Sequence, residues 1–352
     1  MSPSNPPQSL PVILDNRPVF DASVPGFSEA YYVIWTDPTA KRSMVVRYVL
    51  FNGPTEGTQI AEVWCWYRDQ VSGDDIAVRQ RYPLSAVRIA PGHFRLEIGT
   101  SSGLTENRAW GVVEEGGRVV TWDFDMPSAG AHPVDRLKGA GNSVLFPRFY
   151  STGCKRTISA RVTVDGREIR ANAVEATDGH YWNTHNLRTW SWANGVRFRE
   201  DSSAFLEAIA FRLYANDAPM AVSVAFGSGG WTWQNDALES MYLNREIETA
   251  LERWRVSACF GQQRVEAEVT GNPDDMILIT HPLPDGSFLY TTITLNAQIR
   301  LQVFEGSNAE AQPARVLNSD GGASFEVTKP ERNPRVKREF KIVPAPARLI
   351  GT

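Results

Sequence analysis

The chain has 352 residues, a hydrophobic share of 42%, a charged share of 22% and a net charge of −4. This length exceeds that of most single hydrophobic cores, so two domains are expected. The charged residues are mixed in sign and form no basic stripe of the kind that neutralises phosphates, which argues against nucleic acid as a partner. Eleven tryptophans indicate large sheet faces or a large pocket.

The N-terminus has no cationic region followed by a long apolar run, and nowhere do about 18 apolar residues run together. We therefore expect a cytoplasmic protein without a transmembrane segment. Cys65, Cys154 and Cys259 lie far apart and lack the CxxC spacing, which favours buried thiols over a disulfide or a metal site. Only His180 and His185 are close together in sequence, without a third ligand at a metal spacing. With no phosphate-binding glycine loop either, we expect no metal and no cofactor.

Short runs rich in Val, Ile, Tyr, Phe and Trp begin at Ala30 and are separated by turn residues, a pattern typical of all-β barrels and sandwiches. In the first part of the chain they predict strands over residues 30–36, 43–52, 58–68, 93–99 and 118–125. The run from Met44 to Phe51 is largely apolar on both faces. This strand is therefore expected to be covered on both sides, by a second barrel or by an apolar ligand.

A linker is predicted over residues 126–142, which are rich in Pro, Gly and Ala and show no period. We place the domain boundary there, with an N-terminal barrel over residues 1–135 and a C-terminal barrel over residues 143–352. Asp165 and Gly166 predict a hairpin turn. Further strands are expected over residues 205–214, 218–227, 252–260, 263–271, 275–282 and 287–306, and two strand-like pieces in the tail are expected to close the second barrel.

One segment differs from the others, because residues 235–251 carry apolar side chains at helical spacing and predict a single short helix. The sequence as a whole therefore predicts an all-β fold of two consecutive antiparallel barrels with one short helix.

Candidate chemistry is concentrated in residues 178–194. Polar and aromatic side chains crowd these seventeen positions: Asp178, His180, Tyr181, Trp182, His185, Asn186, Arg188, Trp190, Trp192 and Asn194. A carboxylate or an imidazole can transfer protons, and indole faces can exclude water and stabilise a carbocation, as acid-initiated chemistry on an apolar alkene requires. A purely structural alternative stays open, in which Trp190 and Trp192 alternate on a strand and close a barrel end.

The stretch from Val162 to Asn194 resembles the family of carotenoid 1,2-hydratases (hydroxyneurosporene synthases) and AttH-like proteins. The matching positions are an acidic residue, an imidazole, an indole and a W-x-W strand: Asp178, His180, Trp182, and Trp190 to Trp192. Asn183 departs from the family pattern by replacing a glycine, and Tyr181 by replacing Asn, Gln or Glu. The family consists of double lipocalin-like barrels and is related to fungal Diels–Alderases and, more distantly, to tocopherol cyclases. The resemblance therefore implies that both barrels are lipocalin-like.

The resemblance also implies a function. It suggests a cofactor-free lyase or isomerase that acts on an apolar polyene, terpenoid or polyketide-type substrate by cyclisation, Diels–Alder type reaction or hydration. His180 or Asp178 is expected to transfer the proton in a pocket between the barrels. The expected substrate-binding side chains come from the same segment: Tyr181, Trp182, Asn183, Trp190, Trp192 and Asn194. The alternative is a non-catalytic binder or carrier of a lipid, pigment or prenyl compound, the commoner role of a lipocalin barrel.

Overall fold

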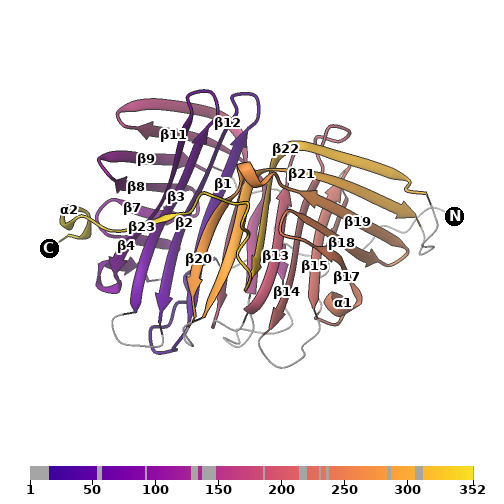
Figure 1. Cartoon of the computed structure of the whole chain (residues 1–352), viewed down its shortest axis with the longest axis horizontal. Helices are drawn as coiled ribbons and strands as arrows, with labels where there is room; N and C mark the ends of the chain where they lie inside the picture. The colour runs from indigo at the N-terminus through magenta and orange to yellow at the C-terminus, as the bar shows by residue number, and fades with distance from the viewer. Residues whose placement is uncertain are drawn as a thin grey trace.

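The computed structural model describes residues 16–53, 58–91, 93–127, 134–136, 148–184, 187–213, 220–229, 231–234, 238–283, 287–305 and 312–351. Most of these residues belong to two β-sheets that lie side by side (Figure 1). Both α-helices of the described part are short, α1 (Leu238–Leu243) and α2 (Ala347–Ile350), and α1 lies within the predicted helical segment. The predicted all-β fold of two lipocalin-like barrels is confirmed, with two short helices in the described residues where the sequence predicted one. No helix within the described ranges is long and apolar enough to cross a membrane.

The first sheet has thirteen strands in the order β23-β4-β3-β2-β1-β12-β11-β9-β8-β7-β6-β5, with β10 beside β11. Its pairs are antiparallel except for β23 with β4. Their bounds are β1 (Ser28–Asp37), β2 (Arg42–Asn52), β3 (Gln59–Asp69), β4 (Asp74–Pro83), β5 (Val87–Ile89), β6 (Arg95–Ile98), β7 (Ser102–Thr105), β8 (Arg108–Glu115), β9 (Arg118–Asp125), β10 (Val134–Arg136), β11 (Arg148–Val164), β12 (Arg167–Asn183) and β23 (Lys341–Pro344).

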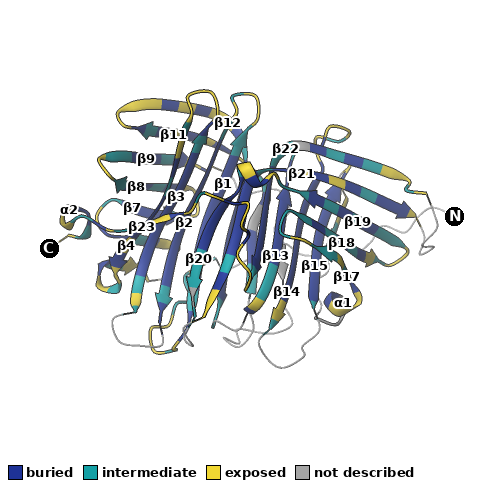
Figure 2. Cartoon of the chain, viewed as in Figure 1, coloured by how far each residue is buried: buried dark blue, intermediate teal, exposed yellow. Residues whose placement is uncertain are grey.

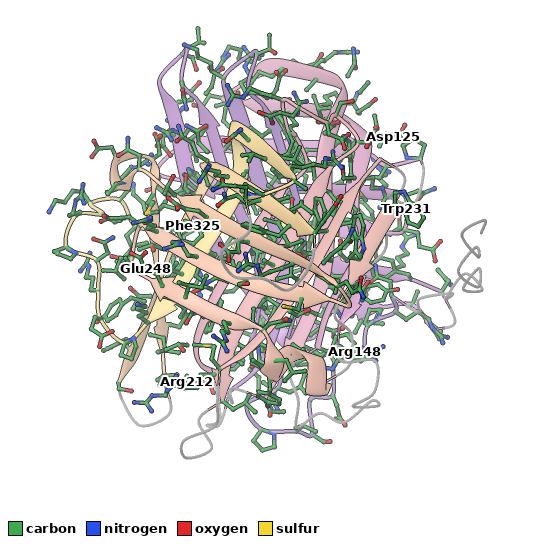
Figure 3. The ribbon with its side chains drawn as sticks, turned by 90° about the vertical axis from the view of Figure 1, so that its right-hand side faces the viewer. Asp125, Arg148, Arg212, Trp231, Glu248 and Phe325 are labelled. Atoms are coloured by element: carbon green, nitrogen blue, oxygen red, sulfur yellow. The ribbon has the colours of Figure 1, made fainter. Side chains whose placement is uncertain are left out.

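The second sheet has ten strands in the order β16-β15-β14-β13-β22-β21-β19-β18-β17, with β20 beside β21. In Figure 3 the labelled Trp231 and Glu248 mark its two edge strands, β16 and β17, on opposite sides of the view. The bounds are β13 (Leu187–Gly195), β14 (Phe205–Leu213), β15 (Ala221–Ser228), β16 (Trp231–Gln234), β17 (Arg245–Thr249), β18 (Arg253–Phe260), β19 (Gln263–Thr270), β20 (Ile277–Pro282), β21 (Phe288–Glu305) and β22 (Arg315–Lys329).

The long strands β11 and β12 follow the expected linker yet pair with β9 and β1 of the first sheet. The turn between them is the predicted hairpin, in which Asp165 and Gly166 both adopt positive φ angles. Along the chain, the first change of sheet falls between Asn183 and Leu187, at the step from β12 to β13, and β23 later returns to the first sheet. The predicted division into domains over residues 1–135 and 143–352 therefore stays a prediction. Most of the expected linker lies outside the described residues.

Side chains of the central strands alternate between two compartments. On β2, Met44, Val46 and Tyr48 lie in the core of the first barrel, whereas Val45 and Val49 lie in a separate core between the two sheets. The prediction that this strand is covered on both faces is confirmed. Figure 2 shows the result as an almost continuous band of buried positions through the middle of the molecule. Two barrels therefore pack through the outer faces of their sheets.

The tail divides between the two barrels. The first of its predicted strand-like pieces lies in β22 of the second sheet, as expected, but β23 pairs in parallel with β4 of the first sheet. Just before β23, the backbone N–H of Phe340 donates to the carbonyl of Leu278 on β20 at 3.0 Å, and the centre of the Phe340 ring lies 5.8 Å from that of Trp64. The expectation that both pieces close the second barrel is therefore wrong for the second piece, because Phe340 packs in the core between the sheets and Val343 packs against the core of the first barrel.

Phe340 is expected to stabilise the packing of the two barrels against each other. Its side chain is 6% exposed in the core between the sheets, so Phe340→Ala should lower the free energy of unfolding by about 3–5 kcal/mol. Ile342→Ala, two residues further along at a 48% exposed position, should cost less than about 0.5 kcal/mol. Urea unfolding of both variants checks this, and equal losses would contradict the assignment.

Candidate functional site

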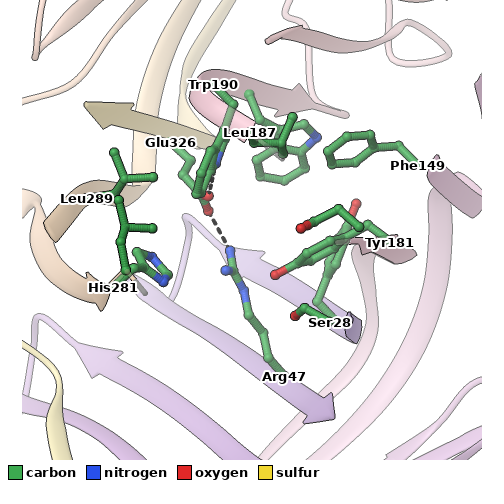
Figure 4. A pocket seen from close by; sticks show the side chains of 13 residues that line it. Ser28, Arg47, Phe149, Tyr181, Leu187, Trp190, His281, Leu289 and Glu326 are labelled. Atoms are coloured by element: carbon green, nitrogen blue, oxygen red, sulfur yellow. Dashed lines mark hydrogen bonds and ion pairs between the residues drawn. The ribbon is translucent and has the colours of Figure 1, made fainter. Parts of the chain in front are cut away.

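A pocket with a volume of about 110 Å³ lies between the two sheets (Figure 4). It is lined from the first sheet by β1, β2, β11 and β12, and from the second by β13, β20, β21 and β22. Thirteen side chains form its surface: Ser28, Tyr32, Arg47, Phe149, Tyr181, Asn183, Leu187, Trp190, Trp192, His281, Leu283, Leu289 and Glu326. Because both barrels contribute, the pocket exists only when they are docked.

Aromatic rings form most of its wall. Tyr181 stacks on Phe149 with the ring centres 5.7 Å apart, and Tyr32 meets Trp192 edge-on at the same distance. Such paired rings hold one another in position and leave an apolar surface of defined shape. The wall is therefore suited to an apolar ligand with flat or unsaturated parts.

One ion pair crosses the pocket from barrel to barrel. Nη2 of Arg47 donates to Oε2 of Glu326 at 2.6 Å, and both side chains are 8% exposed. Nε1 of Trp190 donates to the other carboxylate oxygen at 2.7 Å. Both oxygens of Glu326 are therefore engaged, whereas the Arg47 guanidinium has further N–H donors on a group that lines the pocket.

Burial and charge fix the protonation of these groups. Burial lowers the pKa of Arg47, but the Glu326 carboxylate, together with Tyr181 and Tyr32, outweighs this and leaves it raised. Burial raises the pKa of Tyr181 above its ordinary value of 10.0, against the opposing charge of Arg47. Arg47 thus stays cationic and Tyr181 keeps its hydroxyl proton at neutral pH. The pocket offers two hydrogen-bond donors of different kinds, a guanidinium and a phenol.

Four of the predicted substrate-binding residues line this pocket: Tyr181, Asn183, Trp190 and Trp192. Asn194 is buried next along the same face of β13, opposite Glu207 of β14, and does not line the pocket. His185 and Asn186 lie outside the described residues.

The predicted catalytic residues lie on the other face of β12. Asp178 pairs with Arg156 at 2.9 Å, and Nε2 of His180 lies 2.6 Å from Oε1 of Glu29. Trp182 packs beside His180, with 4.7 Å between the ring centres. Since successive residues of a strand point to opposite faces, the motif is divided between the pocket and the inside of the first barrel.

Eight of the thirteen pocket residues lie outside the predicted segment, and among them Arg47, His281 and Glu326 come from distant strands. Nε2 of His281 lies 3.0 Å from the Thr291 hydroxyl, and its ring meets Trp190 edge-on at 5.9 Å. One feature of the sequence could have identified Arg47, because it is the single charge in a run that is apolar on both faces. A charge in such a run needs a partner from another element. Within the described ranges, no three His, Cys, Asp or Glu side chains are grouped as metal ligands.

The buried ion pair makes a testable contribution. Glu326→Gln leaves the Arg47 charge buried without a counter-charge, which should cost about 3–5 kcal/mol of unfolding free energy. Glu168→Gln, which breaks an exposed pair with Arg170, should change it by less than about 1 kcal/mol. Urea unfolding measures both, and a cost below that of the exposed pair would show that Arg47 is solvated.

No protein-family model matches the sequence, and no curated protein matches it. Solved structures do match. A candidate AttH protein from Nitrosomonas europaea has a TM-score of 0.52 and 13% identity, covering 94% of this chain and 99% of its own. CghA has a TM-score of 0.52 and 7% identity, covering 86% and 87%. Kievitone hydratase from Nectria haematococca has a TM-score of 0.49 and 10% identity, covering 88% and 91%. The chain shares the fold of the first two, and the predicted resemblance is confirmed at the level of the fold.

Proposed function

We propose that the protein is a cofactor-free lyase or isomerase, and that its substrate is an apolar polyene, terpenoid or polyketide-type molecule bound between the two barrels. The observation that carries this proposal is the pair of donors, Arg47 and Tyr181, within a wall of aromatic and aliphatic side chains. An apolar body would lie against the rings, while one polar group, best a carbonyl oxygen, would accept hydrogen bonds from the donors.

The donors supply the chemical step. A carbonyl that accepts from Arg47 and Tyr181 becomes more electrophilic, and negative charge that develops on its oxygen is stabilised in a site of low dielectric constant. Removal of one such donor typically costs about 2.7–4 kcal/mol of transition-state stabilisation. Cyclisation, cycloaddition and conjugate addition of water to an unsaturated carbonyl all profit from this polarisation. Glu326 has both oxygens engaged, so it holds Arg47 and Trp190 in place.

The walls supply the conformation. A flexible polyene must fold so that its reacting carbons meet, and a preformed pocket that binds only the folded conformer removes that entropic cost. The rings of Tyr32, Phe149 and Trp192 are fixed by their neighbours, which favours such selection. Proton transfer by His180 or Asp178 stays part of the proposal only for a substrate that reaches the inside of the first barrel.

The second candidate function is that of a carrier. This function is favoured because polar side chains of the pocket already bind other side chains of the protein. Glu326 accepts from Arg47 and Trp190, and His281 contacts the Thr291 hydroxyl. A binder needs apolar walls and few polar anchors, whereas an enzyme also needs a group that acts on the transition state. Organic extraction of protein purified from its producer, followed by mass spectrometry, identifies the bound molecule. Conversion of that molecule by the protein then separates the two functions.

Tyr181→Phe tests the enzymatic function. The variant keeps the ring that stacks on Phe149 and removes one donor, so kcat should fall about 10²–10³-fold while the melting temperature stays close to that of the wild type. Tyr290→Phe, on β21 outside the pocket lining, should leave kcat unchanged. If both variants bind the extracted molecule and neither loses turnover, Tyr181 has no part in the reaction.

His180→Gln is the complementary test of the predicted acid–base residue. If the reaction takes place in the pocket, this variant should keep more than a tenth of the wild-type kcat, because its side chain lies on the far face of β12. A general acid or base contributes about 10²–10⁴-fold. A loss of that size in His180→Gln with full activity in Tyr181→Phe would move the chemistry into the first barrel.

A further inference from the structure

The pocket between the barrels has a more exposed end and a buried end. Ser28 and Asn183, which face each other across β1 and β12, are half-buried. Tyr32, four residues further along β1, is 8% exposed, and Trp192 is 7% exposed. Four residues of extended strand cover about 13 Å. The pocket therefore deepens along β1 from Ser28 and Asn183 to a floor formed by Tyr32 and Trp192.

A buried carboxylate holds the indole of Trp192 in place. Nε1 of Trp192 donates to Oε1 of Glu207 on β14 at 3.2 Å, and the thiol of Cys154 donates to Oε2 of the same carboxylate at 3.1 Å. Glu207 is 4% exposed and Cys154 0%. A rotation of the indole would take a hydrogen bond away from a buried carboxylate, which is unfavourable. Trp192 therefore keeps its position when a ligand enters.

The ring of Tyr32 lies against the backbone of β12. Gly179 is its partner across the strands, and a Cβ atom at Gly179 would lie 2.3 Å from Cζ of Tyr32. The glycine thus lets the ring lie directly on the sheet, and the sheet blocks any movement of the ring away from the pocket. Both residues of the floor are therefore backed by fixed structure.

The indole of Trp190 in the side wall is held in the same way as that of Trp192. Its Nε1 donates to Glu326 at 2.7 Å, and the same carboxylate binds Arg47 from the opposite sheet (Figure 4). A larger ligand could widen the pocket only by breaking these buried contacts. The volume of the pocket is therefore a fixed property of the protein.

This volume limits the size of the group that can enter. The pocket holds about 110 Å³. An apolar cavity of about 150 Å³ binds benzene, whereas drug-sized ligands occupy pockets of about 300–1,000 Å³. A pocket of this size with fixed walls has room for one ring and not for two. Any further part of a larger substrate would lie beyond Ser28 and Asn183.

We propose that the part of the substrate that enters the pocket is a single flat ring bearing a carbonyl group, and that Tyr32 and Trp192 set this size limit. The inference rests on the proposed function, because the carbonyl oxygen is the acceptor for Arg47 and Tyr181. The aromatic side chains of the wall favour a flat ring over a saturated one. A polyene or polyketide-type chain attached to the ring would extend outward past Ser28 and Asn183.

Acetophenone and 2-acetylnaphthalene test the size limit, because the second differs from the first by one added ring. The indole ¹H–¹⁵N signals of Trp190 and Trp192 report binding to the wild-type protein, with Trp190→Phe and Trp192→Phe used for assignment. Acetophenone should shift both signals saturably and bind at least tenfold more tightly than 2-acetylnaphthalene. An open groove would give the opposite order, because a second ring buries more apolar surface.

The third probe, α-methylstyrene, has nearly the shape of acetophenone but carries a CH₂ group in place of the carbonyl oxygen. It should bind about tenfold more weakly, since it accepts no hydrogen bond from Arg47 or Tyr181. Equal affinities of these two probes would overturn the proposal together with the proposed function. Equal or tighter binding of 2-acetylnaphthalene, with the preference for the carbonyl preserved, would overturn the proposal alone.

Trp192→Phe tests the residue that sets the limit. The smaller ring leaves space at the floor, so this variant should bind 2-acetylnaphthalene at least tenfold more tightly than the wild type does, as followed at Trp190. Trp231→Phe, at a 58% exposed position on β16, should keep the wild-type preference. A folded Trp192→Phe variant with an unchanged preference would contradict the role of Trp192. If the variant does not fold, the order of the two ketones on the wild-type protein still decides.

Discussion

A single layer of sheet, formed by β1, β2 and β12, separates two buried compartments, and the rest of the structure depends on this shared wall. Every side chain on it must face either the core of the first barrel or the space between the barrels. His180 and Tyr181 are neighbours in sequence and yet belong to different compartments. A shift of the wall by one residue would exchange the two sets of side chains and destroy both compartments.

Charges in the space between the barrels determine how the sheets dock. Besides Arg47 and Glu326, Glu62 of β3 binds Arg79 and Arg81, and Nη1 of Arg79 reaches the carbonyl of Thr280 in the second sheet. Burial raises the pKa of Glu62, but the two guanidinium groups outweigh this and hold it below the ordinary value. Buried pairs of this kind add little net stability, because desolvation offsets their attraction. Their effect is to make unfavourable any arrangement of the two sheets that separates the charged partners.

The sequence predicted the β-architecture well, because strand periodicity is a local property and the two-faced burial of β2 could be read from Met44 to Phe51. It also predicted four residues that line the pocket. It did not predict their partners, since Arg47 and Glu326 are far apart in the chain and only the docking of the sheets brings them together. The sequence also did not show which residues of the motif face the pocket and which face the inside of the first barrel. The face that a residue occupies depends on the strand register, which no local pattern specifies.

The parallel pairing of β23 with β4 has a consequence for biosynthesis. Residues 341–344 complete the edge of a sheet whose neighbouring strand ends at Pro83. During translation the β4 edge of the first barrel therefore stays open until residues 341–344 have left the ribosome. Open edges invite pairing with other chains, and contacts of such long sequence separation form slowly. The β4 edge is therefore exposed to wrong pairing for as long as residues 341–344 are missing from the nascent chain.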